Sequence, residues 1–134
     1  MELFYTNKLL DNDAAYQKFI SDSPGIGYLK IRASSANEAI PVEGLRIIVS
    51  KNIGSNKVIF FEGKTDYSGM INNIVLPAPK PIDNDEIPPT FNSYDVEAIN
   101  NDIDNNYNIS VCCGFTVIQY INVIPSTVKG LYGN

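Results

Sequence analysis

The side chains that could do chemistry in this sequence are carboxylates in loops, because the chain contains no histidine. Without an imidazole, a serine or cysteine has no usual base to remove its proton, so the common nucleophilic mechanisms are excluded. A carboxylate pair can act as acid and base only where a pocket raises the pKa of one member. Nothing around the loop carboxylates indicates such a pocket, so we expect solvated charges, no catalytic residues and no enzyme. These carboxylates are Asp83, Asp85, Glu86, Asp102 and Asp104.

The sequence also lacks the residue patterns that metal and phosphate sites need. Residues 11–13 and 102–104 carry oxygen ligands but lack the spacing of a calcium loop. Cys112 and Cys113 are adjacent, and a zinc site would need further ligands that the sequence does not supply. We expect one buried thiol and one exposed or interface thiol, with an intermolecular disulfide as the alternative. Residues 25–27 (Gly-Ile-Gly) are too short for a phosphate loop and lack its lysine. The sequence therefore predicts no metal and no cofactor.

Length and charge narrow the class of protein further. The 134 residues fit one domain, and 44% hydrophobic residues are enough for a core. The net charge of −5 disfavours nucleic acid and anionic membranes as partners. No apolar run approaches the roughly 20 residues of a membrane span. The first residues lack the basic flank and apolar stretch of a secretory signal. We therefore expect synthesis in the cytoplasm without a signal peptide, followed by association with a spore, a virion or a tail.

Residues 1–24 differ from the rest and predict an N-terminal arm with a short helix. Aspartates in residues 11–13 can cap a helix that runs from residue 14 to 20 and stops at residues 23–25. So short a helix is not stable alone, so it must dock on the domain behind it or on a neighbouring subunit. We expect one or more of the apolar side chains of this arm to contact another subunit or a larger particle: Leu3, Phe4, Leu9, Tyr16, Phe19 and Ile20.

From Gly27 onward the apolar residues alternate, which is typical of strands. Short strands with regular turn signals predict an all-β domain over residues 25–125, with a tail over residues 126–134. We predict a proline-rich connection over residues 77–90 and a loop rich in Asn and Asp over residues 100–108. Residues 109–124 read as two strands or one strand bent at Cys113-Gly114. We expect core or cross-strand positions for Tyr28, Phe60, Phe61 and Tyr94, and loop or tail positions for Tyr107 and Tyr132.

Several segments, in this order, resemble the carboxypeptidase-regulatory-like domains, which are prealbumin-like (transthyretin-like) sandwiches. They are Gly27-Tyr28-Leu29-Lys30-Ile31, Ala39-Ile40-Pro41-Val42-Glu43-Gly44, Thr65-Asp66-Tyr67-Ser68-Gly69, Leu76-Pro77-Ala78-Pro79 and Tyr94-Asp95-Val96-Glu97-Ala98. The last two segments make the chain similar to the version found in clostridial spore cortex-lytic and peptidoglycan-binding proteins. In the turn motif of Thr65, Asp66 and Gly69, the aspartate can accept backbone N–H groups and the glycine supplies a positive φ. The resemblance implies a seven-stranded Greek-key β-sandwich with a short N-terminal helix or arm.

The functions that remain are structural. Our first expectation is a non-catalytic assembly module of a larger particle, such as a spore layer or a phage-tail-like assembly. It would interact with protein partners or with itself through its N-terminal arm and sheet edges. The alternative, implied by the resemblance, is a module that binds cell-wall peptidoglycan or a spore peptidase or lytic enzyme. Residues 105–108 (Asn-Asn-Tyr-Asn) stand where such domains often carry a Gly-Tyr pair, and no catalytic module follows residue 125 in this sequence.

Overall fold

The computed structural model describes residues 13–36, 39–81, 90–101 and 103–124. One helix precedes eight strands in this part of the chain. The elements are α1 (Ala14–Asp22), β1 (Gly25–Ser35), β2 (Ile40–Pro41), β3 (Arg46–Ile53), β4 (Asn56–Lys64), β5 (Met70–Ala78), β6 (Asn92–Ile99), β7 (Asp104–Val111) and β8 (Thr116–Asn122). Leu3, Phe4 and Leu9 lie outside the described residues, as do Asp83, Asp85, Glu86, Asp102 and the C-terminal tail from residue 125.

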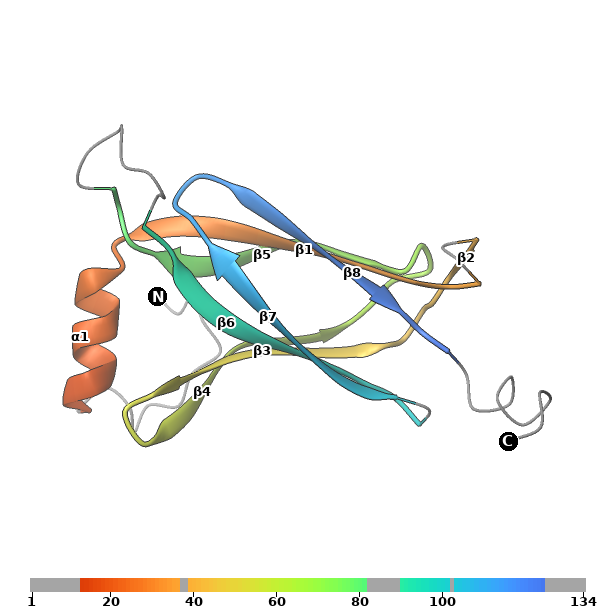
Figure 1. Cartoon of the computed structure of the whole chain (residues 1–134), viewed down its shortest axis with the longest axis horizontal. Helices are drawn as coiled ribbons and strands as arrows, with labels where there is room; N and C mark the ends of the chain where they lie inside the picture. Colours follow the sequence, from red (N-terminus) through yellow and green to blue (C-terminus); the bar gives the residue numbers. More distant parts are fainter. Residues whose placement is uncertain (1–12, 37–38, 82–89, 102, 125–134) are drawn as a thin grey trace.

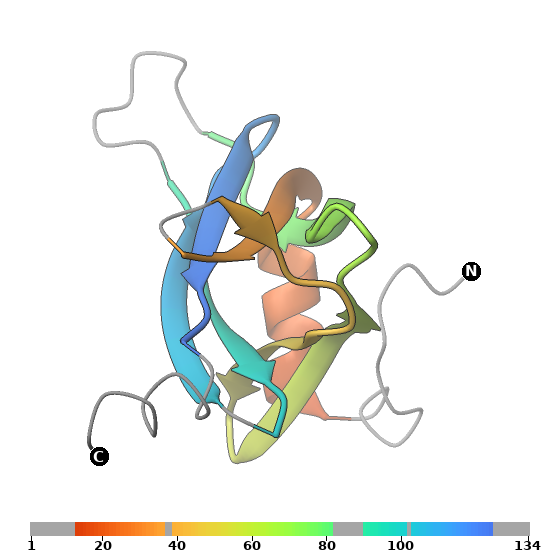
Figure 2. The same ribbon diagram turned by 90° about the vertical axis from the view of Figure 1, so that its right-hand side faces the viewer.

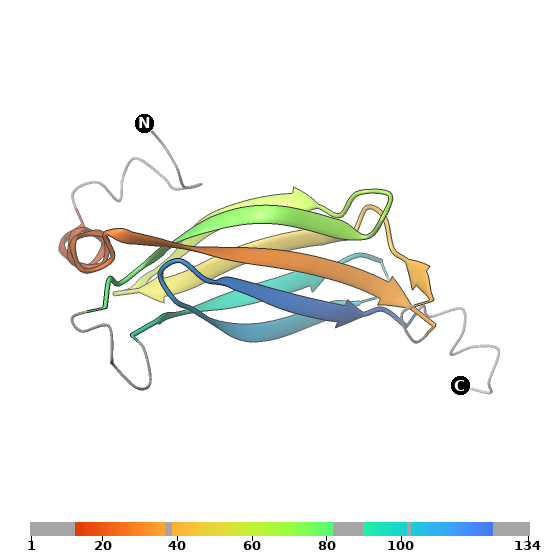
Figure 3. The ribbon, with the colours of Figure 1, turned by 90° about the horizontal axis from the view of Figure 1, so that it is seen from above.

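The strands form two stacked sheets of four strands each (Figures 1 and 2). In the first sheet β1 pairs antiparallel with β2 and β5 and parallel with β8. The second sheet has the order β4-β3-β6-β7 and is antiparallel throughout. Seen from above, β1 lies between β5 and β8 (Figure 3). The expected all-β sandwich is therefore confirmed, with the two-residue β2 added to the seven strands expected.

The core fills the space between the two sheets with apolar side chains from both of them. Along β1 the buried and exposed positions alternate, so Leu29 and Ile31 are fully buried while their neighbours face out. Tyr94 of β6 crosses this core, and its hydroxyl donates a hydrogen bond of 2.5 Å to the carbonyl of Pro77 on β5. Burial raises the pKa of Tyr94, so the phenol stays protonated and keeps tying the two sheets together.

The helix α1 packs against one end of this core (Figure 1). Asp13 caps it by accepting the N–H of Tyr16 at 2.9 Å, as the sequence predicted. Tyr16 is buried, and Phe19 and Ile20 are partly buried against the core. The helix therefore docks on the domain that follows it, which was one of the two alternatives expected from the sequence. A contact of these three side chains with another subunit stays a prediction. No helix among the described residues is long and apolar enough to cross a membrane.

The C-terminal half corrects two expectations and decides between the two alternatives for residues 109–124 in favour of two strands. Asp104 to Asn108, expected within a loop, form most of β7, because this strand turns Tyr107 toward the core and Asn106 and Asn108 outward. The apolar stretch that follows breaks at residues 112–115 into a tight turn, with Gly114 at φ 83°, so it holds the end of one strand and a second strand. Both cysteines are free and partly buried, so the expected division into one buried and one exposed thiol is wrong, and the interface alternative stays a prediction.

The glycines at residues 25 and 27 let the β7–β8 turn lie against β1. A Cβ atom on Gly27 would stand 2.2 Å from a side-chain carbon of Val111 and 2.6 Å from the carbonyl oxygen of Cys112. On Gly25 it would stand 2.7 Å from the sulfur of Cys113. Contacts this short require the backbone to move, so these positions are fixed by packing. The two glycines thus permit the close approach of β1 to the β7–β8 turn.

Candidate functional site

Three parts of the surface were candidates for function: a polar face, an apolar face and the expected turn motif. The described residues contain no group of three or more Cys, Asp or Glu side chains that could hold a metal ion. Asp13 caps α1 and also accepts a hydrogen bond from the side chain of Asn56. Asp104 is exposed at the start of β7.

The outer face of the sheet β4-β3-β6-β7 is polar. It holds a shallow depression of about 290 Å³ lined by Ser50, Asn52, Lys57, Asp95, Glu97 and Asn106. The two carboxylates already have partners: Lys57 lies 3.8 Å from Glu97, and Asn108 donates to Asp95 at 3.1 Å. Carboxylates that already have partners on an open face are poorly placed to act as an acid–base couple. The depression can instead offer amide, hydroxyl and carboxylate groups to a polar ligand.

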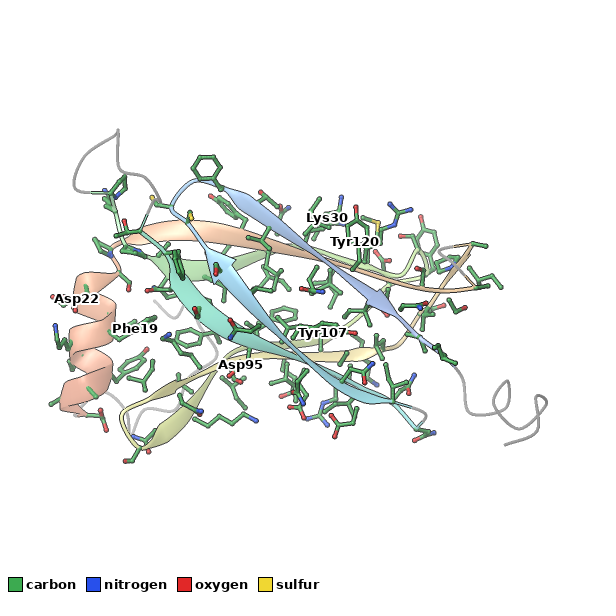
Figure 4. All side chains as sticks on the ribbon, viewed as in Figure 1. Phe19, Asp22, Lys30, Asp95, Tyr107 and Tyr120 are labelled. Carbon is green, nitrogen blue, oxygen red and sulfur yellow. The ribbon has the colours of Figure 1, made fainter. Side chains whose placement is uncertain are left out.

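The outer face of the opposite sheet carries exposed apolar side chains along β1 and β8. We call this surface the β1–β8 face; it consists of Ile26, Tyr28, Lys30, Arg32, Ile118 and Tyr120. The pairing of the two strands places Lys30 beside Ile118 and Arg32 beside Tyr120. Figure 4 shows Lys30 and Tyr120 together on the outer side of this sheet, and Asp95 on the outer side of the other.

The β1–β8 face exposes much apolar area. Ile118 and Tyr120 are 46% and 51% exposed, and Ile26 and Tyr28 are each 37% exposed. Phe115, in the turn just before β8, is 66% exposed. Among the described residues, Lys30 and Arg32 have no acidic partner. Clustered tyrosine, isoleucine and unpaired cations are typical of a protein contact surface.

The sequence did not single out Ile118 or Tyr120. Both lie in a stretch where apolar residues fill consecutive positions, so the usual alternation of apolar and polar residues does not mark the exposed face. The only sequence signal would have been that alternate residues of β8 must face away from the core once the segment is recognised as a strand.

The expected turn motif lies between β4 and β5 and joins the two sheets. Thr65 is 4% exposed; its hydroxyl accepts the N–H of Leu45 at 3.0 Å and donates to the carbonyl of Val42 at 2.7 Å. Asp66 accepts the N–H groups of Ser68 and Met70, both at 2.9 Å. Gly69 has φ 78°. The predicted hydrogen bonding of the aspartate and conformation of the glycine are thus confirmed, and the motif acts on structure.

Comparisons with known proteins give the fold and no family. No family model and no curated protein matches the chain. The Bacillus anthracis TIE protein matches with a TM-score of 0.50 and 19% identity over 73% of this chain, which spans only 16% of that protein. The Klebsiella pneumoniae 5-hydroxyisourate hydrolase matches with a TM-score of 0.49 and 16% identity, covering 74% of this chain and 90% of that one. The Streptococcus agalactiae minor pilin GBS52 matches with a TM-score of 0.49 and 13% identity, covering 73% and 44%.

At these identities the likeness concerns the fold alone. The strand pairing of the two four-stranded sheets defines the class of this protein as an all-β, prealbumin-like sandwich. The relation to clostridial spore cortex-lytic proteins is not tested by these matches and stays an expectation.

Replacing Thr65 by valine should destabilise the fold. The substitution keeps the shape of the side chain but leaves the buried N–H of Leu45 without its acceptor, which costs about 1–3 kcal/mol. Urea unfolding should show this loss for Thr65→Val, while Thr65→Ser, which keeps the hydroxyl, should lie close to the wild type. Equal stability of the valine variant and the wild type would contradict the structural role of the hydroxyl.

The turn should also make stability depend on pH through Asp66. Hydrogen bonds, first from the N–H of Met70 and then from Ser68, hold the pKa of Asp66 below its ordinary value of 3.8. The folded state therefore gains stability from this carboxylate above about pH 4, and loses it as the pH falls through the lower folded pKa. Asp66→Ala should lower the thermal midpoint at neutral pH, and the difference should shrink below pH 4.

The control is Glu43→Ala, which removes another exposed carboxylate. Glu43 lies between Val42 and Gly44, whose backbone groups form hydrogen bonds with Thr65, the neighbour of Asp66. A difference between Asp66→Ala and wild type that stays constant from neutral pH to the most acidic condition would contradict the assignment.

Proposed function

We propose that this chain is a non-catalytic assembly module of a larger particle, such as a spore layer or a phage-tail-like assembly, which binds partners through its N-terminal arm and its sheet edges. The observation that supports the proposal best is the exposed apolar area of the β1–β8 face. In water such an area is unfavourable, and covering it with a partner recovers about 25 cal/mol for each Å² of apolar surface removed.

The chemistry of the surface supports the same proposal. Tyr28 and Tyr120 carry large rigid rings whose burial costs little side-chain entropy, and such residues are enriched in contact surfaces. Arg32 is exposed beside Tyr120, so a partner that brings a carboxylate would gain an ion pair as well as apolar contact. The carboxylates of the opposite face are paired to Lys57 and Asn108, which favours a role other than acid–base chemistry.

An assembly role predicts that the chain sediments with a particle in extracts of the cells that produce it. Most of the protein should migrate far ahead of a free 14.8 kDa chain in a density gradient. Leu3→Asp/Phe4→Asp should shift it to the light fractions, because two charges replace the apolar residues expected to bind. The control Thr6→Asp/Asn7→Asp adds the same charge to the same arm and should leave the heavy fraction unchanged. A wild-type chain found only in the light fractions would overturn the proposal.

A second candidate function is binding of cell-wall peptidoglycan, favoured by the polar depression of the sheet β4-β3-β6-β7. Its amides and carboxylates suit the hydroxyl and amide groups of a glycan peptide. If this function is present, purified peptidoglycan should retain the chain in a pull-down at low salt. Asn52→Ala/Asn106→Ala should reduce retention, and Glu43→Ala should not. Absence of retention for the wild type removes this alternative.

A further inference from the structure

The two sheets of the described chain end in four long strands that have a neighbour on one side only: β5 and β8 in the first sheet, β4 and β7 in the second. A strand in this position presents unpaired N–H and C=O groups to solvent. Natural proteins protect such edges with charged residues, prolines, bulges or irregular pairing, because an unprotected edge pairs with another strand. The four edges therefore differ in what they can bind.

Three of these edges carry protection. The edge β4 has charged residues and a shift of register against β3. The edge β5 has a shift of register against β1, a residue with positive φ and a proline. The edge β7 begins with an aspartate and is rich in asparagine, which is unfavourable in strands. The residues concerned are Lys57, Glu62 and Lys64 in β4, Asn73 and Pro77 in β5, and Asp104, Asn105, Asn106 and Asn108 in β7.

The edge strand β8 carries none of these protections. Its sequence, Thr-Val-Ile-Gln-Tyr-Ile-Asn, has no charged residue, no proline and no glycine. Its pairing with β1 runs without a register shift from Thr116 to Asn122. Ile118 and Tyr120, which favour strands, are about half exposed on its outer face. Such a strand has the properties of a template for strand addition.

The hydrogen bonds show which backbone groups of β8 are free to pair. The carbonyl of Phe115 accepts the N–H of Tyr28 at 2.9 Å, and the N–H of Val123 donates to Ser34 at 2.8 Å, so these two residues face β1. In a parallel ladder every second residue faces the same neighbour, so the backbone groups of Ile118 and Tyr120 face away from β1. In place of a neighbouring strand, the side-chain amide of Gln119 donates to the carbonyl of Tyr120 at 2.8 Å.

We propose that β8 pairs antiparallel with β8 of a second copy of this chain, about a two-fold axis at Gln119. The inference rests on the proposed assembly function and names the edge and the partner that serve it. This register uses all seven residues of the strand. It places Ile118 opposite Tyr120 of the second copy on the outer face, and Val117 opposite Ile121 on the core side. The first sheets of two copies then form one continuous sheet.

A second copy fits this edge because the strand is complementary to itself. The two central cross-strand pairs on the outer face each join Tyr120 of one copy with the β-branched Ile118 of the other, which is a favourable combination. No charge of one copy meets a like charge across the pairing, since β8 has none, and Lys30 and Arg32 lie one strand farther from the axis. The net charge of −5 on each chain opposes the approach, so association should strengthen as salt screens this repulsion.

The test is the mass of the purified full chain, measured by light scattering from low micromolar to millimolar concentration at physiological and at higher salt. We expect the mass to rise from 14.8 kDa toward twice that value, and to rise at lower concentration when salt is added. Ile118→Lys/Tyr120→Lys places four like charges around the axis and should weaken association by at least about tenfold. Both side chains are exposed, so circular dichroism should show an unchanged fold.

The control is Tyr67→Lys, which replaces an 81% exposed tyrosine in the β4–β5 turn and should leave association unchanged. Hydrogen exchange adds a backbone measurement: the N–H groups of Ile118 and Tyr120 should exchange at least about tenfold more slowly at high than at low concentration. A wild type that stays monomeric at all concentrations, or a dimer that survives the double lysine substitution, overturns the inference. If the chain still sediments with a particle in cell extracts, the assembly function stands and only the edge or the partner is wrong.

Discussion

The parallel pairing of β1 with β8 is the interaction on which the rest of the structure depends. β1 is the central strand of its sheet, bonded to β2 and β5 on one side and to β8 on the other. Its inward residues Leu29 and Ile31 are fully buried in the core, so a loss of either partner strand would expose them. The pairing is possible because Gly25 and Gly27 leave room for the turn that leads into β8.

The two outer faces of the sandwich then acquire opposite characters. On the sheet β4-β3-β6-β7 several charged side chains have partners on the same face, including the pairs Arg46–Glu62 and Lys57–Glu97. On the β1–β8 face the cations have no such partners among the described residues, and apolar side chains surround them. The fold thus has one polar outer face, on which several charges are already paired, and one β1–β8 face, whose apolar groups and cations would gain from contact with a partner.

Much of this fold follows from the sequence, because its strands alternate and its turns carry clear signals. The cap of α1 by Asp13 and the turn at Asp66 and Gly69 were predicted from residue types alone. The first five residues of β7 were missed because they include three asparagines and an aspartate, and only the packing of Tyr107 against the core reveals them as strand. The exposed residues of β8 were missed because both faces of that strand are apolar. Which face is buried depends on tertiary pairing, which periodicity does not report.

The same β1–β8 pairing has a consequence for the order of events during synthesis. Among the described residues it joins the first strand to the last, so the closing contact of the sheet has a very large separation in sequence. Contacts of this kind form late and slow the folding of β proteins, because the entropy of closing the intervening loop is lost before the contact is made. While the ribosome is still making the last strand, one edge of β1 has no partner. The sandwich can therefore close only when translation of the domain is nearly finished.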